Sequence, residues 1–259
     1  MRRRTRLTLR CLATAVVAAA LFFPAIASAA ETVDLLLVFA VDVSRSIDQD
    51  KFQLQRDGYA AAITSPRVLE AIRSGPHHRI AVIFVEWSGM GFQRVVIDWT
   101  MIGDAASAQQ FASALAEAPR SFQDRTSISG AIEFSMAQLD KAPFDAPRRT
   151  IDISGDGTNN AGRDVRLARD EALAKGVTIN GLVILSEHPL SWNAEHTNPP
   201  GGLDKYYEAN VIGGPGAFVM VAQNFNSFGT AIVNKMIAEI AAADVRQVPH
   251  GPRLARQAH

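Results

Sequence analysis

Cysteine is almost absent from this sequence, since Cys11 is the only one in 259 residues. It lies in an apolar run, residues 11–26, that follows five arginines and ends at Ala27-Ser28-Ala29. A basic start, a short apolar run and a small-residue end are typical of a secretory signal peptide, and the run is shorter than the roughly 20 residues that span a membrane. We therefore expect residues 1–29 to be a cleaved signal peptide. The exported chain is expected to be periplasmic or secreted, without a membrane span and without disulfide bonds.

Excess basic charge is missing as well. The sequence has 26 Lys and Arg residues and 26 Asp and Glu residues, and five of the arginines belong to the expected signal peptide. The exported chain then carries 21 basic and 26 acidic residues, a net charge of −5. A mildly acidic chain without a basic stripe gives no indication of nucleic-acid binding. Residues 30–244 are long enough to bury the core of one domain, whereas residues 245–259 show no apolar face and are expected to form a flexible tail.

The signatures of several enzyme classes are absent, and we do not expect an enzyme. The sequence has no Gly-x-Ser-x-Gly elbow, no Asp-x-Asp-x-Thr phosphatase motif and no Walker loop. The glycine-rich residues 213–216 precede a strand, so they indicate a chain reversal and not a dinucleotide fingerprint. Glu86 is the only carboxylate that we would consider as a general base near the carboxyl edge of the expected sheet. Its position in a buried strand favours a structural role. The histidines lack metal-ligand spacing and are expected at the surface: His77, His78, His188, His196, His250 and His259.

Buried strands alternate with amphipathic helices along the chain. The helical period is clear in residues 104–117, which carry apolar side chains at i, i+3, i+4 and i+7. Residues 94–99 return from a glycine-rich turn and should form an antiparallel edge strand, and residues 186–202 should form a long loop. This order predicts an α/β fold, a Rossmann-like three-layer α/β/α domain with a mainly parallel sheet. The other expected strands are apolar runs at residues 35–41, 79–86, 149–154, 177–185 and 217–222.

Side chains with oxygen donors follow two of these strands. Asp42, Ser44 and Ser46 come directly after the first strand, and Asp156 follows another. The direction of each element places Thr126 at the same edge of the sheet, where open α/β sheets bind ligands. Oxygen donors alone suit Mg²⁺, Mn²⁺ or Ca²⁺ better than zinc. The alternatives are helix caps for the serines and Asp42, and an ordinary turn around Asp156. Thr126 is expected to cap the helix that follows it as well as to face the ion.

Three segments carry a family resemblance: Asp42-Val43-Ser44-Arg45-Ser46, Arg125-Thr126-Ser127-Ile128-Ser129-Gly130 and Ser154-Gly155-Asp156-Gly157. Together they resemble the metal-ion-dependent adhesion site (MIDAS) of von Willebrand factor type A domains. The resemblance implies the type A fold and hydroxyl ligands from Ser44, Ser46 and Thr126. It also implies that Asp42 and Asp156 bind the ion directly or through water. The sequence departs from the pattern at Gly155, where many type A domains have Thr or Ser.

Further segments resemble a bacterial family of exported, type A-like proteins of unknown function, DUF1194: residues 55–58, 86–89, 151–160, 179–181 and 211–219. The predicted function is a metal-dependent protein-binding module in which a partner's Asp or Glu completes the coordination of the ion. Specificity is expected from a rim formed by residues 87–93, 118–125 and 186–202, although Trp87 and Phe92 themselves are expected to pack in the core. The alternatives are a metal-assisted hydrolase and a scaffold with a vestigial metal site.

Overall fold

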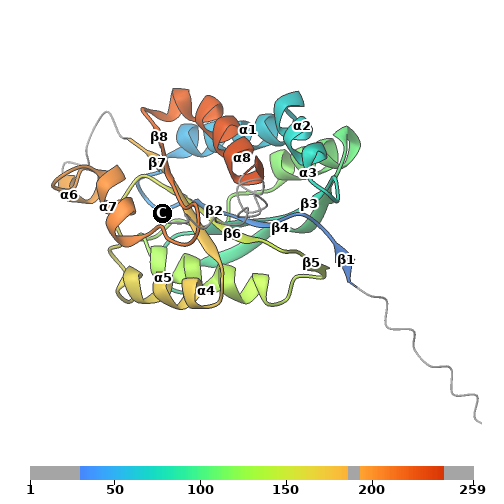
Figure 1. The fold of residues 1–259 in the computed structure, drawn as a ribbon. Coiled ribbons are helices and arrows are strands. Elements are labelled where there is room, and N and C mark those ends of the chain that lie inside the picture. Colours follow the sequence, from blue (N-terminus) through green and yellow to red (C-terminus); the bar gives the residue numbers. More distant parts are fainter. Residues whose placement is uncertain (1–29, 186–192, 242–259) are drawn as a thin grey trace, which may run out of the picture.

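The chain folds into a central sheet with helices on both faces (Figure 1). The computed structural model describes residues 30–185 and 193–241. The predicted signal peptide, the predicted tail and residues 186–192 of the predicted rim lie outside the described residues. No described helix is both long and apolar enough to cross a membrane.

The main sheet has six strands in the order β4-β3-β2-β6-β7-β8. β3 and β4 pair in antiparallel fashion, and the other neighbouring strands pair in parallel. A second, two-stranded sheet joins β1 (Glu31–Thr32) to β5 (Phe144–Asp145). The predicted antiparallel edge strand in a mainly parallel sheet is therefore confirmed. The six strands of the main sheet are β2 (Leu36–Asp42), β3 (Ile80–Trp87), β4 (Gln93–Ile102), β6 (Arg149–Gly155), β7 (Thr178–Ile184) and β8 (Val219–Ala222).

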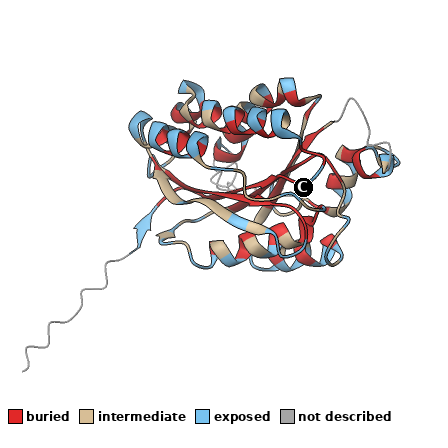
Figure 2. Ribbon diagram, turned by 180° about the vertical axis from the view of Figure 1, so that it is seen from behind, coloured by how far each residue is buried: buried red, intermediate tan, exposed pale blue. Residues whose placement is uncertain are grey.

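Helices cover each face of this sheet, so the predicted three layers are confirmed (Figures 1 and 2). One face is covered by α1 (Gln49–Thr64), α2 (Pro66–Ser74), α3 (Ala105–Glu117) and α8 (Phe228–Ala241), which follows the short 3-10 helix η1 (Phe225–Ser227). The other face is covered by α4 (Ile128–Leu139), α5 (Val165–Ala174) and α7 (Leu203–Asn210). A short helix, α6 (Ala194–Thr197), precedes α7.

The central strand β2 joins the two cores. Successive side chains of a strand point to opposite faces, so Leu37 and Phe39 pack toward α1 and α8, while Leu36 and Val38 pack toward α4 and α5. All seven residues of β2 are buried, as a continuous apolar run predicts. The strand therefore delivers its last residue, Asp42, to the carboxyl edge of the sheet from a fully packed position.

Local signals in the sequence account for most helix boundaries. Asp48 caps α1, because its side chain accepts a hydrogen bond from the Lys51 backbone N–H at 2.9 Å. Pro66 ends the helical face of α1 and occupies the first turn of α2, where its missing N–H costs nothing. The expectation of a long loop over residues 186–202 was incomplete, since α6 lies inside it. α7 was not predicted either, because its buried residues, Leu203 and Tyr207, are too few to give a periodic pattern.

Candidate metal site

Four of the five predicted ligands meet at the carboxyl edge of β2 and β6. The Ser46 hydroxyl donates to Asp156 Oδ1 at 2.5 Å, and Ser44 Oγ lies 3.1 Å from Ser46 Oγ. The Ser44 backbone N–H donates to Asp42 Oδ1 at 2.7 Å. All four residues are buried, and Asp42 and Asp156 have no exposed surface. Helix capping does not explain these residues, because the cap of α1 is Asp48.

Thr126 reaches the same edge from a separate passage of the chain. No hydrogen bond joins it to the other four predicted ligands among the described residues, but it faces a cavity of about 290 Å³ that Ser46 also lines. Its backbone N–H donates to Asn160 Oδ1 at 2.9 Å, and its carbonyl accepts from the Asn160 N–H at 2.9 Å. The prediction that Thr126 caps the next helix was wrong, since Ser127 is the cap of α4. Its buried hydroxyl is therefore not used by the helix.

The two carboxyl groups are buried together, and burial disfavours their ionised forms. Asp42 Oδ2 and Asp156 Oδ2 are buried without a hydrogen-bond partner among the described residues. Burial raises the pKa of Asp42 to about 8, with Asp156 adding to the effect and the Ser44 bonds opposing it. Burial likewise raises the pKa of Asp156, against the Ser46 hydrogen bond. A divalent cation would offset this cost, because a nearby positive charge favours the ionised form of each carboxyl.

The donor set fits a hard cation only if the hydroxyl groups take part. No three Asp, Glu, His or Cys side chains in the described parts of the chain are arranged to hold a metal ion. The carboxylates of Asp42 and Asp156 therefore need the neutral oxygens of Ser44, Ser46 and Thr126 to complete a coordination sphere. Such an oxygen-rich set is typical of Mg²⁺, Mn²⁺ and Ca²⁺ sites.

Two basic side chains, which the sequence motif does not contain, hold the loop that carries the serines. The Arg120 guanidinium donates to the carbonyls of Val43 at 2.8 Å and Ile47 at 2.7 Å. The Lys51 ammonium donates to the Ser46 carbonyl at 2.9 Å. Both groups bond to backbone oxygens of the loop and so hold its backbone in place.

The expectation of a surface position was wrong for His196. Only 4% of this residue is exposed, and its Nε2 lies 3.2 Å from Thr126 Oγ1. Burial lowers its pKa, which favours the neutral ring. It enters the site from α6, within a stretch that sequence periodicity assigned to a loop. No spacing relative to the predicted ligands could have identified it, because 70 residues separate it from Thr126.

The departure from the type A pattern at position 155 has a steric cause. A Cβ atom on Gly155 would lie 2.7 Å from the Tyr207 hydroxyl oxygen and 3.1 Å from Asp42 Oδ2. Tyr207 is fully buried, and its hydroxyl has no hydrogen-bond partner among the described residues. The tyrosine from α7 therefore occupies the space that a side chain at position 155 would need.

The other candidate residues divide between the core and the rim. Glu86 pairs with Arg56 at 2.6 Å and accepts from the Ser121 N–H at 2.9 Å, so its predicted structural role is confirmed. Trp87 is fully buried, as predicted. Phe92 is 45% exposed and contacts the ring of Phe122, so the prediction that it packs in the core was wrong.

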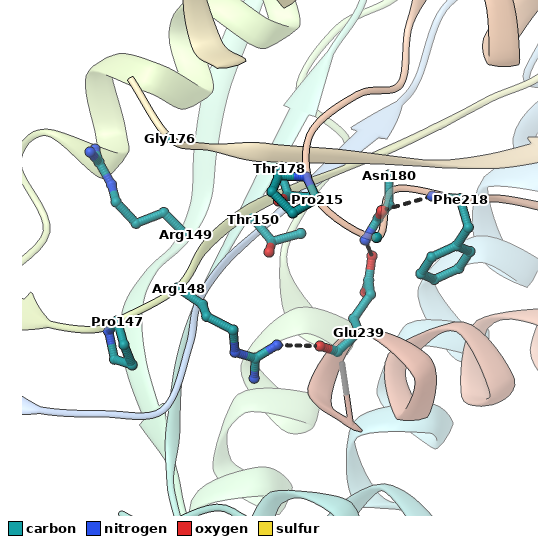
Figure 3. A pocket seen from close by; sticks show the side chains of 11 residues that line it. Pro147, Arg148, Arg149, Thr150, Gly176, Thr178, Asn180, Pro215, Phe218 and Glu239 are labelled. Atoms are coloured by element: carbon teal, nitrogen blue, oxygen red, sulfur yellow. Dashed lines mark hydrogen bonds between the residues drawn. The ribbon is translucent and has the colours of Figure 1, made fainter. Parts of the chain in front are cut away.

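A second group of buried charges lies away from this site. The Lys235 ammonium on α8 contacts Asp152 Oδ1 at 2.7 Å and also the carboxylate of Glu239, and all three side chains are buried. Figure 3 shows Glu239 accepting a hydrogen bond from Asn180 at the edge of a cavity of about 40 Å³. This volume holds a few water molecules at most. No pattern in the sequence predicted this cluster, because Lys235 and Glu239 lie on α8 while Asp152 comes from β6.

Comparison with known proteins identifies the family of the chain. The model of the family described as "Protein of unknown function (DUF1194)" matches residues 32–244. The chain belongs to this family. No curated protein matches the sequence.

Several solved structures share the fold at low sequence identity. The pilus adhesin SpaC from Lactobacillus rhamnosus GG is 12% identical with a TM-score of 0.56, and the match covers 81% of this chain and 31% of that one. A von Willebrand factor type A protein from Catenulispora acidiphila is 15% identical with a TM-score of 0.53, and the match covers 81% and 43% of the two chains. Proximal thread matrix protein 1 from the mussel byssus, solved with a zinc-occupied MIDAS motif, is 14% identical with a TM-score of 0.52, and the match covers 83% and 47%. The chain spans less than half of each of these proteins. Their similarity shows that this DUF1194 protein has a von Willebrand factor type A-like fold.

Proposed function

We propose that this DUF1194 protein is a divalent-metal-dependent protein-binding module, in which an Asp or Glu of the partner completes the coordination of the ion. The observation that carries the proposal is the pair of buried, unpartnered oxygens, Asp42 Oδ2 and Asp156 Oδ2, beside the linked hydroxyls of Ser44 and Ser46. Two ionised carboxylates buried together are unfavourable unless a cation pairs with them. The adhesin and matrix proteins that share the fold support the same class of function.

The donors in this proposal are Asp42, Ser44, Ser46, Thr126 and Asp156, and the ion is Mg²⁺, with Mn²⁺ or Ca²⁺ as alternatives. The bound ion supplies an electrophilic centre for an anionic ligand. Two carboxylates balance its charge, while the hydroxyls contribute dipoles without further negative charge. A site with this composition retains attraction for a carboxylate from outside.

The surface beside the site suits an acidic partner. The cavity lined by Ser46 and Thr126 is also lined by Arg45 and Arg125. Arg45 has a side chain that is 66% exposed, and its contact with Asp124 is a long one of 3.6 Å. An exposed pair at this distance is weak, so Arg45 remains available to attract a carboxylate toward the ion.

We also propose that the protein acts outside the cytoplasm, with residues 1–29 as signal peptide and residues 245–259 as a tail after the binding domain. This part of the proposal rests on the arginines and the short apolar run at the start of the sequence.

The direct test is calorimetric titration of the protein of residues 30–259 with Mg²⁺, Mn²⁺ and Ca²⁺. Asp156→Asn keeps the shape of the side chain but removes its charge, so it should abolish measurable binding while the melting temperature shows that the protein remains folded. Asp57→Asn is the matched control, because Asp57 is an exposed carboxylate on α1. It should bind the ion like the wild type.

Capture of partners from a periplasmic extract, in Mg²⁺ and in EDTA, tests the second half of the proposal. A protein retained only with Mg²⁺ and an intact Asp156 supports the mechanism. Metal binding without any metal-dependent partner would contradict the adhesion role, and absence of metal binding would favour a scaffold with a vestigial site.

A metal-assisted hydrolase is the second candidate, and the observation that favours it is the buried His196 beside Thr126. A general base needs a nitrogen that faces the substrate. Both ring nitrogens of His196 instead contact protein groups, Thr126 on one side and Thr158 with Asn160 on the other. Glu86 is committed to Arg56. The binding module is therefore the better supported function.

A further inference from the structure

The contacts of His196 extend the proposed metal site beyond the residues of the motif. Resting on the proposed function, we infer that His196 is a positioning residue, which donates a hydrogen bond from Nε2–H to Thr126 Oγ1 and so directs the remaining lone pair of that hydroxyl to the ion. The inference stands on the 3.2 Å contact between these two atoms, both of which are buried.

The neighbouring amide determines which ring nitrogen carries the proton. Asn160 Oδ1 accepts from the Thr126 N–H at 2.9 Å, so the other end of this amide, Nδ2, is the donor end. Nδ2 lies 3.3 Å from His196 Nδ1, which must then act as an acceptor. A neutral imidazole with an acceptor at Nδ1 carries its proton on Nε2. The nitrogen that faces Thr126 is therefore the donor.

This arrangement uses the Thr126 hydroxyl in one defined way. The oxygen has two lone pairs and one proton. One lone pair accepts from His196, which leaves the second lone pair for a cation and the proton for a separate acceptor. Without the histidine the Thr126 hydroxyl could rotate, because α4 is capped by Ser127 and the Thr126 hydroxyl takes no part in that cap. Groups that orient ligands in this manner commonly tune the affinity of metal sites.

The surrounding backbone is built to admit the ring. A Cβ atom on Gly157 would lie 2.3 Å from His196 Nε2, so any larger residue beside Asp156 would displace the imidazole. The Thr158 N–H donates to the His196 carbonyl at 2.9 Å, and Thr158 Oγ1 lies 3.2 Å from Nδ1. The ring is thus held from both the backbone and its far nitrogen, with Nε2 left to Thr126.

The test compares His196→Leu, which fills the space without a donor, with His196→Gln, which restores an N–H donor. Titration with Mg²⁺ and Mn²⁺ should show an affinity roughly 10-fold or more below the wild type for the leucine variant, and recovery of most of that loss by glutamine. Urea denaturation of both variants checks the fold. If the two variants are equally stable, a lower affinity of the leucine variant cannot be assigned to unfolding.

Nitrogen-15 NMR of the histidine ring gives a readout that does not depend on the metal. His196 should show the Nε2–H tautomer in the metal-free protein. The Nδ1–H tautomer would overturn the inference, and so would equal affinities of the wild type and the leucine variant. That last outcome leaves the proposed function standing, whereas a wild type that binds no divalent ion would remove both.

Discussion

Replacing Lys235 by methionine tests how the buried charges hold α8 against the sheet. The ammonium of Lys235 contacts Asp152 Oδ1 at 2.7 Å and the Glu239 carboxylate, and no surface of these side chains is exposed. Methionine fills a similar volume but removes the ammonium that contacts both buried carboxylates. Breaking a buried ion pair from one side costs about 3–5 kcal/mol. For a domain of this size that corresponds to a fall in melting temperature of roughly 6–20 °C.

The cost should depend on pH in a defined direction. Burial raises the pKa of Asp152, Lys235 opposes the rise, and Glu239 adds to it. A carboxyl whose pKa is raised on folding contributes stability at low pH, and this contribution is lost as the pH rises toward the folded-state pKa. Removing Lys235 takes away the charge that opposes this rise, so the pKa of Asp152 should rise further. The variant should therefore lose more stability relative to the wild type at pH 8 than at pH 5.

Urea denaturation at pH 5 and pH 8, in EDTA so that no divalent ion occupies the candidate metal site, measures both effects. Lys205→Met is the matched control, because Lys205 pairs with Glu208 at 2.8 Å but its side chain is 63% exposed. Its cost should stay below about 1 kcal/mol. Adding Asp152→Asn to Lys235→Met should recover part of the loss. A cost below about 1 kcal/mol for Lys235→Met, or one that is the same at both pH values, would refute the reasoning.

Three other predictions concern the site and its rim. Gly155→Ser should lower the free energy of unfolding by about 1–3 kcal/mol through overpacking. Adding Tyr207→Phe should recover much of this loss, because it removes the hydroxyl that lies 2.7 Å from the new Cβ. A loss that Tyr207→Phe does not change would contradict the steric account. Arg120→Met removes the donor to the loop carbonyls and should weaken Mg²⁺ binding by roughly 10-fold in calorimetry, so an unchanged affinity would be the contrary result. Phe92→Ser alters a side chain that is 45% exposed on the rim, and should reduce partner capture while changing the melting temperature little; full capture by the variant would exclude Phe92 from the interface.

The layers of the fold were predictable because they depend on short-range patterns. A continuous apolar run such as residues 35–41 is typical of a strand buried on both faces, and β2 is that strand. The rule that parallel strands end at one edge then placed Asp42 and Asp156 together without any knowledge of their contacts. The direction of the elements before Thr126 placed it at the same edge. Its contacts could not be predicted in this way.

The contacts across the sheet could not be predicted in this way. Lys235 and Asp152 come from α8 and β6, and each looks unremarkable in its own segment. A lysine in a helix is normally expected at the surface, so nothing local indicates that this one is buried. Only the packing of α8 onto the sheet brings the charges together, and a single sequence holds no record of that packing.

The two walls of the candidate site therefore have different origins. One wall consists of Asp42, the serines and Asp156, which lie close to strand ends and follow from the strand pattern. The other consists of His196 from α6 and Tyr207 from α7, two helices that lack a periodic signal. Gly157 and Gly155 provide the space for these two rings. Each glycine thus makes room for one ring, Gly157 for His196 and Gly155 for Tyr207. Replacing a glycine alone should therefore disturb the site more than replacing the glycine together with its ring.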